Sequence, residues 1–295
     1  MHLDRDHLAA LQAILKLGSF ESAAASLGLS QPAISLRIRA LEDHVGLPLI
    51  QRGSPCVGTL AGTRLGQHAE TIALMEHEAL RDLDLAIGTA PTRVAVAVNA
   101  DSLATWFPLV LKDLPDLVLD IQMDDQDHSA HWLKSGDVKA AVTGTSKAEK
   151  GCDVMPLGQQ RYVATASPDF VNRWFANGVT TETLMQAPLV TYTYKDQLQS
   201  RWMQQVTGKK LFPPTHLLPS THGFVAATRD GAAWAMNPIH LVKKDLSDGT
   251  LVEVIPQSAL DVPLFWHCNR HVKTALTPLT KAVKRIAQHA LLQSC

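Results

Sequence analysis

The chain has 295 residues, 46% of them hydrophobic, and a formal net charge of −1. This length is typical of two or three domains with ample apolar cores. No run of about 18 apolar residues offers a membrane span, and the N-terminus lacks a signal-peptide pattern, so we expect a cytoplasmic protein. The four cysteines are scattered without a CxxC or Cys/His cluster, which indicates reduced thiols and no structural zinc. The near-neutral charge gives no support of its own to nucleic-acid binding.

Residues 1–62 predict a small, mostly helical unit. Apolar residues at helical spacing predict a first helix over about 3–17, and Gly18 ends it. A second apolar stripe follows, and Gly28 then supplies a tight turn. Ser30 is a candidate N-cap for a third helix. Two short helices joined by a glycine turn are typical of a helix-turn-helix.

The third helix combines an apolar face with a polar one. Ile34, Ile38 and Leu41 recur at helical spacing and are expected to face inward. The side chains of the other face and of the helix start are candidates for DNA contact: Ser30, Gln31, Pro32, Ser35, Leu36, Arg37 and Arg39. Gln suits adenine, Ser suits a base or a phosphate, and an apolar group suits the thymine methyl. The two arginines are expected at phosphates. The alternative is an ordinary three-helix bundle with a solvated polar face.

A short strand at 48–52 and a turn-rich segment after it predict a β wing, with Arg52 near the DNA backbone. Apolar residues at spacings of three and four then predict a long helix from Thr63 to Ile87, within a linker segment 63–88. Such a helix is suited to pairing with a second copy, because helix-turn-helix proteins usually bind two half-sites. The alternative is a linker helix that packs on its own chain.

From residue 89 to 295 the pattern changes to strands alternating with helices. This alternation predicts an α/β domain with a mostly parallel sheet. The first expected strands lie at 94–98, 117–123 and 139–143, with helices at 129–133 and 276–292. A second set begins near 161–164, and the chain returns to the first set near 265–267. Further strands of this second set are expected at 188–193, 215–219, 232–236 and 251–255.

Ligands of such sheets bind outside the carboxyl ends of strands and near helix N-termini. The candidates at such places are Asn99, Asp101, Ser102, Asp124, Asp125, Thr143, Ser220, Thr221 and His222. The helix turn at Ser102 would hold a carboxylate, and the aspartates would hold an ammonium or guanidinium. The set therefore suits an amino acid with a basic side chain. The alternatives are that Asp101 and Ser220 are simple N-caps and that the acidic run 124–127 is a solvated turn.

Enzyme motifs are missing from the sequence. It contains no GxSxG, HExxH or GxGxxG motif and no phosphate loop, so we expect neither catalysis nor a cofactor. A hydrolase triad of Asp101, Ser102 and a distant histidine has no support from spacing. A solute-binding module for transport is disfavoured by the helix-turn-helix. A structural nucleoid protein is disfavoured by the cleft-forming second half.

Residues 30–35, SQPAIS, resemble the signature of the LysR-type transcriptional regulators, and 59–62 resemble the end of their wing. The resemblance implies a winged helix-turn-helix followed by a two-lobed effector domain like periplasmic binding proteins, crossed twice by the chain. Lobe I would take about 92–160 and 268–295, and lobe II about 161–267. It also implies a homodimer or homotetramer on an interrupted dyad of double-stranded DNA, a small-molecule effector, and RNA polymerase as a candidate partner.

Two residues depart from this family's pattern. Gly58 stands where the family usually has Leu, and we expect it to loosen the wing. Leu36 stands where a polar residue is common, and we expect it to shift the preferred bases.

Residues 96–106, VAVNADSLATW, resemble the LysG and ArgP subgroup, which senses lysine and arginine and controls amino-acid export. The match continues through 125–129, 214–216 and 263–266. It implies a basic amino acid as effector. His222 stands where these sensors tend to have Glu, and histidine is neutral near pH 7. A different amino acid or metabolite is therefore the alternative effector.

Overall fold

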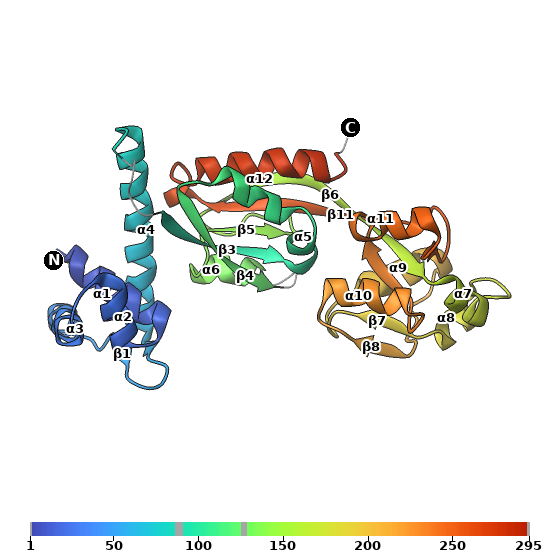
Figure 1. Ribbon diagram of the computed structural model, residues 1–295, viewed down its shortest axis with the longest axis horizontal. Helices are drawn as coiled ribbons and strands as arrows, with labels where there is room; N and C mark the ends of the chain where they lie inside the picture. Colours follow the sequence, from blue (N-terminus) through green and yellow to red (C-terminus); the bar gives the residue numbers. More distant parts are fainter. Residues whose placement is uncertain (1, 86–90, 125–128, 294–295) are drawn as a thin grey trace. The chain divides into compact units, whose positions relative to one another are not determined.

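The computed structural model describes residues 2–85, 91–124 and 129–293, and their side chains except those of 124–131 (Figure 1). The chain forms two compact units. The first comprises the residues up to Val94, with 116–118 and 271–275, and the second comprises the rest. No helix among the described residues is long and apolar enough to cross a membrane.

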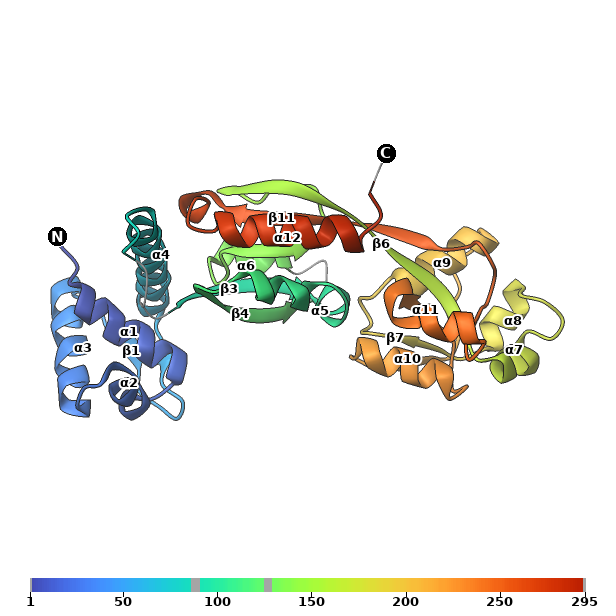
Figure 2. The same cartoon turned by 45° about the horizontal axis from the view of Figure 1, so that its top comes forward.

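The first unit contains the expected helix-turn-helix. Its elements are α1 (Arg5–Leu17), α2 (Phe20–Leu27), α3 (Gln31–Val45), β1 (Ile50–Gln51), β2 (Val57–Gly58) and α4 (Leu60–Asp82). Ser19 and Ser30 cap α2 and α3, and the glycines after α1, α2 and α3 adopt the left-handed conformation. Only glycine adopts that conformation without strain, so these positions end each helix at a fixed residue. Figure 2 shows α1 lying between α3 and α4.

The core of this unit is a continuous apolar cluster beneath the three short helices. Leu11, Ile14 and Ile34 are fully buried in it. Leu15 fills a notch in which a Cβ at Gly58 would lie 2.8 Å from Leu15 Cδ2, and one at Gly66 would lie 2.6 Å from Leu15 Cδ1. Gly58 therefore allows the wing to pack closely, which is opposite to the loosening expected from the sequence.

The long helix begins earlier and ends earlier than expected. Thr59 is its N-cap, with Thr59 Oγ1 accepting a hydrogen bond from the Gly62 amide at 3.0 Å, so α4 begins at Leu60. It ends at Asp82 rather than Ile87, and residues 86–90 lie outside the described residues. The wing strand expected over 48–52 is two residues long.

The second unit is built on a seven-stranded sheet in the order β10-β6-β11-β5-β3-β4, with β9 also pairing with β6. The strands are β3 (Thr92–Asn99), β4 (Leu117–Asp124), β5 (Ala140–Thr143), β6 (Cys152–Ala166), β9 (Ala235–Pro238), β10 (Val252–Glu253) and β11 (Leu260–Asn269). A separate parallel pair is formed by β7 (Leu189–Thr191) and β8 (Thr215–Leu217). The expected strands are present, with bounds shifted by up to several residues.

The prediction of a mostly parallel sheet is wrong. The pairings of β6 with β9, β10 and β11, and of β11 with β5, are antiparallel, whereas β3 pairs with β5 in parallel. The reason is that β6 carries the chain from the first strand set to the second, and β11 carries it back. Their register runs from Tyr162 opposite Leu260 to Cys152 opposite Asn269, so the two crossings lie side by side (Figure 1). The double crossing expected from the resemblance is confirmed.

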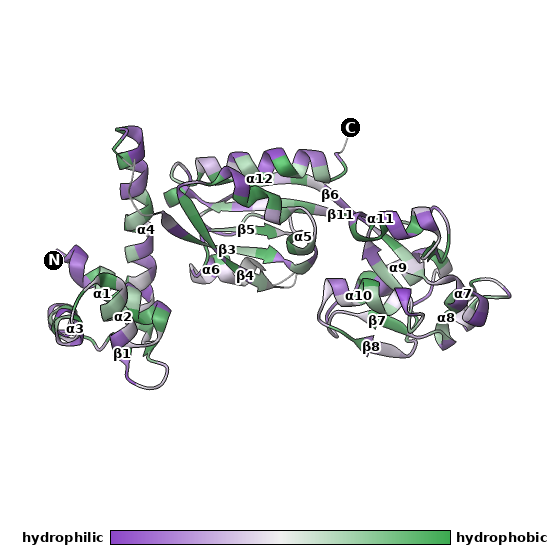
Figure 3. Ribbon diagram, viewed as in Figure 1, coloured by the Kyte–Doolittle hydropathy of each residue, from purple (hydrophilic) through white to green (hydrophobic). Residues whose placement is uncertain are grey.

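Helices cover both strand sets. The first set has α5 (Ala100–Ala104), η1 (Phe107–Asp113), α6 (Ser129–Ser135), η2 (Arg270–Val272) and α12 (Thr277–Ala290). The second set has α7 (Pro168–Trp174), α8 (Thr181–Gln186), α9 (Leu198–Thr207), α10 (Thr221–Arg229) and α11 (Ile239–Asp248). In Figure 3, α12 carries both hydrophilic and hydrophobic residues. Leu279, Ala282, Val283 and Ala287 are its buried positions, at helical spacing.

An aromatic pair centres the core of the second strand set. The rings of Trp202 and Trp234 lie 5.0 Å apart, and both side chains are fully buried. The indole nitrogen of Trp202 donates to the Ser258 carbonyl at 2.9 Å, which ties α9 to the segment before β11. The same core cluster includes Leu189 of β7 and Met203 of α9, so it anchors both elements within the second strand set.

Candidate functional site

The exposed face of α3 is the first candidate site. Ile34, Ile38 and Leu41 are buried, as expected for the inner face. Gln31, Pro32 and Arg39 are exposed, Ser35 is half-buried, and Leu36 is 67% exposed. The side chains that the sequence placed on the outer face therefore form one accessible surface along the start of the helix.

Three other candidates on this unit have partners within it. Ser30 Oγ accepts a hydrogen bond from the Ala33 amide at 3.4 Å, so its side chain is the helix cap. Arg37 forms an ion pair with Asp6 at 2.9 Å and thereby links α3 to α1. The guanidinium of Arg52 lies 5.1 Å from the centre of the Phe20 ring, a cation–π contact between the wing and α2. Arg37 and Arg52 hold the surface together in addition to offering positive charge.

Glu42 positions the wing, a role that the sequence reading did not assign to it. Glu42 Oε1 accepts hydrogen bonds from the amides of Leu49 at 2.7 Å and Ile50 at 3.3 Å. Thr59 Oγ1 donates to the Pro48 carbonyl at 2.7 Å from the other side. A carboxylate at this place in α3 was visible in the sequence, but the amides that it serves lie beyond the next turn.

A second site lies where α5, β6 and α10 meet. The Asp101 carboxylate accepts hydrogen bonds from the hydroxyl of Tyr162 at 2.6 Å and from that of Thr221 at 2.7 Å. Asp101 lies in the first strand set, and Thr221 begins α10 in the second. The carboxylate thus joins the two lobes. The alternative that Asp101 is a helix cap is wrong, because Asn99 Oδ1 accepts from the Ser102 amide at 2.9 Å and is the N-cap of α5.

Two buried polar side chains accompany Asp101. Ser102 is fully buried and Gln160 is 1% exposed. Neither Ser102 Oγ nor either carboxamide atom of Gln160 has a hydrogen-bond partner in the part of the chain that the structure describes. Sequence reasoning missed Gln160 and Tyr162; the signal available was their spacing of two residues, which places both on one face of a strand.

The remaining candidates are engaged locally or exposed. Thr143 Oγ1 bonds within the turn to Thr145, and Ser220 Oγ accepts from the Gly223 amide at 3.1 Å, which confirms it as the cap of α10. His222 is exposed on α10. Asp124 ends β4, but its side chain and all of Asp125 lie outside the described residues.

The ends of β4 and β7 approach each other from the two lobes. The Tyr192 hydroxyl lies 3.9 Å from Met123 Sδ. Both residues adjoin carboxyl ends of strands, where the sequence placed the ligand. No group of three or more metal-ligating side chains occurs among the described residues.

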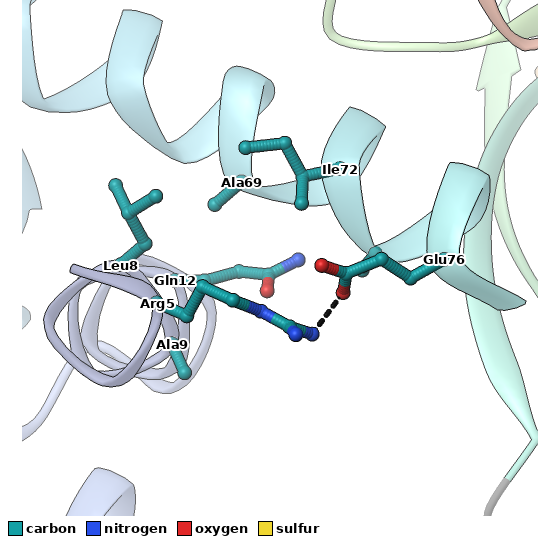
Figure 4. Close-up of a pocket in the computed structure, with 8 residues that line it drawn as sticks. Arg5, Leu8, Ala9, Gln12, Ala69, Ile72 and Glu76 are labelled. Carbon is teal, nitrogen blue, oxygen red and sulfur yellow. Dashed lines mark hydrogen bonds and ion pairs between the residues drawn. The ribbon is translucent and has the colours of Figure 1, made fainter. Parts of the chain in front are cut away.

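Two hollows lie away from these residues. One lies between α1 and α4 and has a volume of about 100 Å³. Figure 4 shows its lining, with Leu8 on α1, Ile72 on α4 and the ion pair of Arg5 with Glu76. A second, of about 250 Å³, lies between β7, α9 and residues 211–215. Ligand pockets typically measure about 300–1,000 Å³, and neither hollow includes a predicted effector residue.

A winged helix-turn-helix followed by a two-lobed sheet domain crossed twice by the chain defines a DNA-binding regulator with a ligand-binding domain. Residues 5–65 match the family model described as bacterial regulatory helix-turn-helix protein, lysR family, and 88–291 match that of the LysR substrate binding domain. The chain belongs to the LysR family of transcriptional regulators.

Several similar proteins are named transcriptional regulators. The regulator LysG of Mycobacterium tuberculosis is 40% identical over 97% of this chain and 94% of its own. The crystal structure of ArgP from Mycobacterium tuberculosis superposes with a TM-score of 0.80 at 39% identity, covering 99% of this chain and 100% of that one. Full-length LysG of Corynebacterium glutamicum with bound effector Arg gives a TM-score of 0.68 at 31% identity, covering 98% and 99%. The chain is therefore a transcriptional regulator and not an enzyme.

Proposed function

We propose that the chain is a cytoplasmic regulator that binds arginine or lysine between its lobes and controls a promoter for amino-acid export. The observation that carries the proposal is the Asp101 carboxylate, which joins α5, β6 and α10 through two hydroxyl groups. A carboxylate at that junction suits the ammonium of an amino acid. The relative from Corynebacterium glutamicum with bound arginine supports this effector class.

DNA contact is proposed for the outer face of α3. Gln31, Pro32, Ser35 and Leu36 would reach base edges, as N-terminal residues of recognition helices do. Arg39, exposed and close to them, would bind phosphate and set the register.

Pairing of two copies is proposed for the second half of α4. Met75 and Leu80 are 51% and 39% exposed there, and Leu83, the residue that follows the helix, is 67% exposed. Burying apolar surface is favourable at about 25 cal/mol per Å², so this row favours a homodimer, and two such dimers would form a homotetramer. A dyad operator requires at least the dimer, since each copy reads one half-site.

The mechanism proposed is a ligand-dependent change in how the lobes are joined. An effector ammonium that binds Asp101 competes with the hydroxyls of Tyr162 and Thr221 for the same oxygens. The ligand can shift the regulator only if it binds the two arrangements with different affinity. The resulting change would alter the spacing of paired recognition helices on the operator.

His222 supports a second class of effector, an amino acid other than arginine or lysine. That residue is exposed on α10 beside Thr221, at a position where the arginine and lysine sensors tend to have Glu. An imidazole lacks the negative charge of a glutamate, so it offers less attraction to a cationic side chain. A different amino acid would then be the effector.

A thermal-shift screen against the common amino acids tests the proposal. An effector at 100 times its Kd stabilises by about 2.7 kcal/mol, which corresponds to roughly 5–10 °C for a domain of this size. Arginine or lysine should give the shift, and Asp101→Asn should remove it. A shift with another amino acid alone would favour the second class, and no shift with any of them would refute an amino-acid effector.

A further inference from the structure

Three buried polar atoms in α5 and β6 require an explanation. Ser102 Oγ and the Nε2 and Oε1 atoms of Gln160 have no hydrogen-bond partner anywhere in the described ranges of the chain. Both residues are at least 99% buried. Buried polar groups are nearly always paired, and each exception calls for a specific cause.

These atoms lie on the same elements as Asp101 and its partner Tyr162. Gln160 and Tyr162 are two residues apart in β6, so their side chains leave the strand on the same face. Tyr162 reaches Asp101 with its hydroxyl at 2.6 Å, and Ser102 follows Asp101 directly in α5. A carboxylate, a hydroxyl and a carboxamide therefore gather where α5, β6 and α10 meet.

The chemistry of this set is that of an amino-acid head group. An α-ammonium needs hydrogen-bond acceptors, and an adjacent α-carboxylate needs donors. The Gln160 carboxamide supplies one acceptor and two donors, and the Ser102 hydroxyl supplies a donor. A cationic side chain alone would need acceptors only, and would leave the Gln160 amide hydrogens unpaired.

We propose that Ser102 and Gln160 bind the zwitterionic head group of a free amino acid. Gln160 Oε1 and Asp101 accept from the ammonium, while Gln160 Nε2 and Ser102 Oγ donate to the carboxylate. This inference rests on the proposed function and adds which part of the effector is recognised here. The side chain is then read elsewhere, which allows one site to accept both arginine and lysine and excludes their decarboxylated forms.

Calorimetric titration of the full-length protein tests the assignment. The ligands are arginine, lysine, agmatine and cadaverine, and the variants are Gln160→Met and Ser102→Ala. The control is Gln159→Met, on the opposite face of the same strand, where the backbone bonds to Leu292 are kept. Hydrogen bonds to charged groups are the stronger kind, so each test variant should lose about tenfold or more in amino-acid affinity. The control should stay within about threefold of the wild type, and the amines should bind the wild type at least tenfold more weakly than the amino acids.

Thermal unfolding without ligand separates recognition from structure. Gln160→Met removes two unpaired buried polar atoms, so its midpoint should equal or exceed that of the wild type. A lower midpoint together with weaker binding would show that the carboxamide holds a structural water, and would overturn the inference. Wild-type affinity in Gln160→Met, or agmatine bound as tightly as arginine, would overturn it too, while leaving the amino-acid effector in place. If the wild type binds no amino acid, the proposed function fails first.

Discussion

Gly62→Ala tests both the direction and the size of a predicted change in the free energy of unfolding. Gly62 lies in the first turn of α4, and replacing a helical glycine with alanine ordinarily stabilises by about 1 kcal/mol. The structure predicts the reverse. A Cβ at this position would lie 1.9 Å from the Leu49 carbonyl oxygen, which is a backbone atom and cannot rotate away.

The size of the destabilisation follows from the two segments that the alanine methyl group would push apart. The helix start and the Leu49 segment would have to move apart by about 1.5 Å to restore ordinary van der Waals contact. Two hydrogen bonds hold them together, from the Thr59 amide to the Leu49 carbonyl at 2.9 Å and from Thr59 Oγ1 to the Pro48 carbonyl at 2.7 Å. Their loss costs about 0.5–1.5 kcal/mol each, and overpacking adds about 1–3 kcal/mol. Alanine regains about 1 kcal/mol through its higher helix propensity. We therefore expect the free energy of unfolding to fall by about 2 kcal/mol in total.

Hydrogen exchange of the full-length protein measures this for the first unit alone. A loss of about 2 kcal/mol corresponds to roughly 30-fold faster exchange of the protected amides of α1–α4. Gly66→Ala is the matched control, because its Cβ would meet only the flexible end of Leu15, at 2.6 Å, and its effect should be smaller. Protection in Gly62→Ala equal to or above the wild type would refute the reasoning.

Three further predictions concern operator binding, effector binding and the ionisation of a buried thiol. Arg39→Ala should weaken operator binding and lower the salt slope by about 1, as for one lost phosphate contact, with effector binding retained; an unchanged slope in gel shifts would exclude that contact. Asp101→Asn should abolish the effector-induced thermal shift while basal operator binding persists, and a retained shift would remove Asp101 from the site. Burial raises the pKa of the Cys152 thiol above 9.0. The unfolded thiol therefore ionises first, so the free energy of unfolding should fall as pH rises through 9.0, and Cys152→Ser should flatten that dependence; an equally steep fall in the variant would contradict it.

The helix-turn-helix was predictable because its signals are local. Gly18 and Gly28 end helices through their own backbone freedom, and Ser30 caps the helix that it precedes. Such features act within four residues along the chain, so the sequence displays them directly.

Strand direction was not predictable in the same way. Alternating strands and helices favour a parallel sheet only if each helix returns the chain to the same edge. β6 and β11 instead carry the chain between lobes in opposite directions, and their pairing is antiparallel. Which strands become crossings depends on contacts about a hundred residues apart.

The features of the candidate sites also fall into two groups, those set by neighbours in the chain and those set by distant segments. The sequence by itself determined the family, the capped helices, the outer face of α3, and Asp101 and Ser102 at a strand end, because each follows from neighbours in the chain. Only the tertiary structure decided that Asp101 accepts from Tyr162 and Thr221, that Arg37 is paired with Asp6, and that Gln160 is buried without a partner among the described residues. A side chain's partners are set by which distant segments pack against it, and no local periodicity encodes that choice.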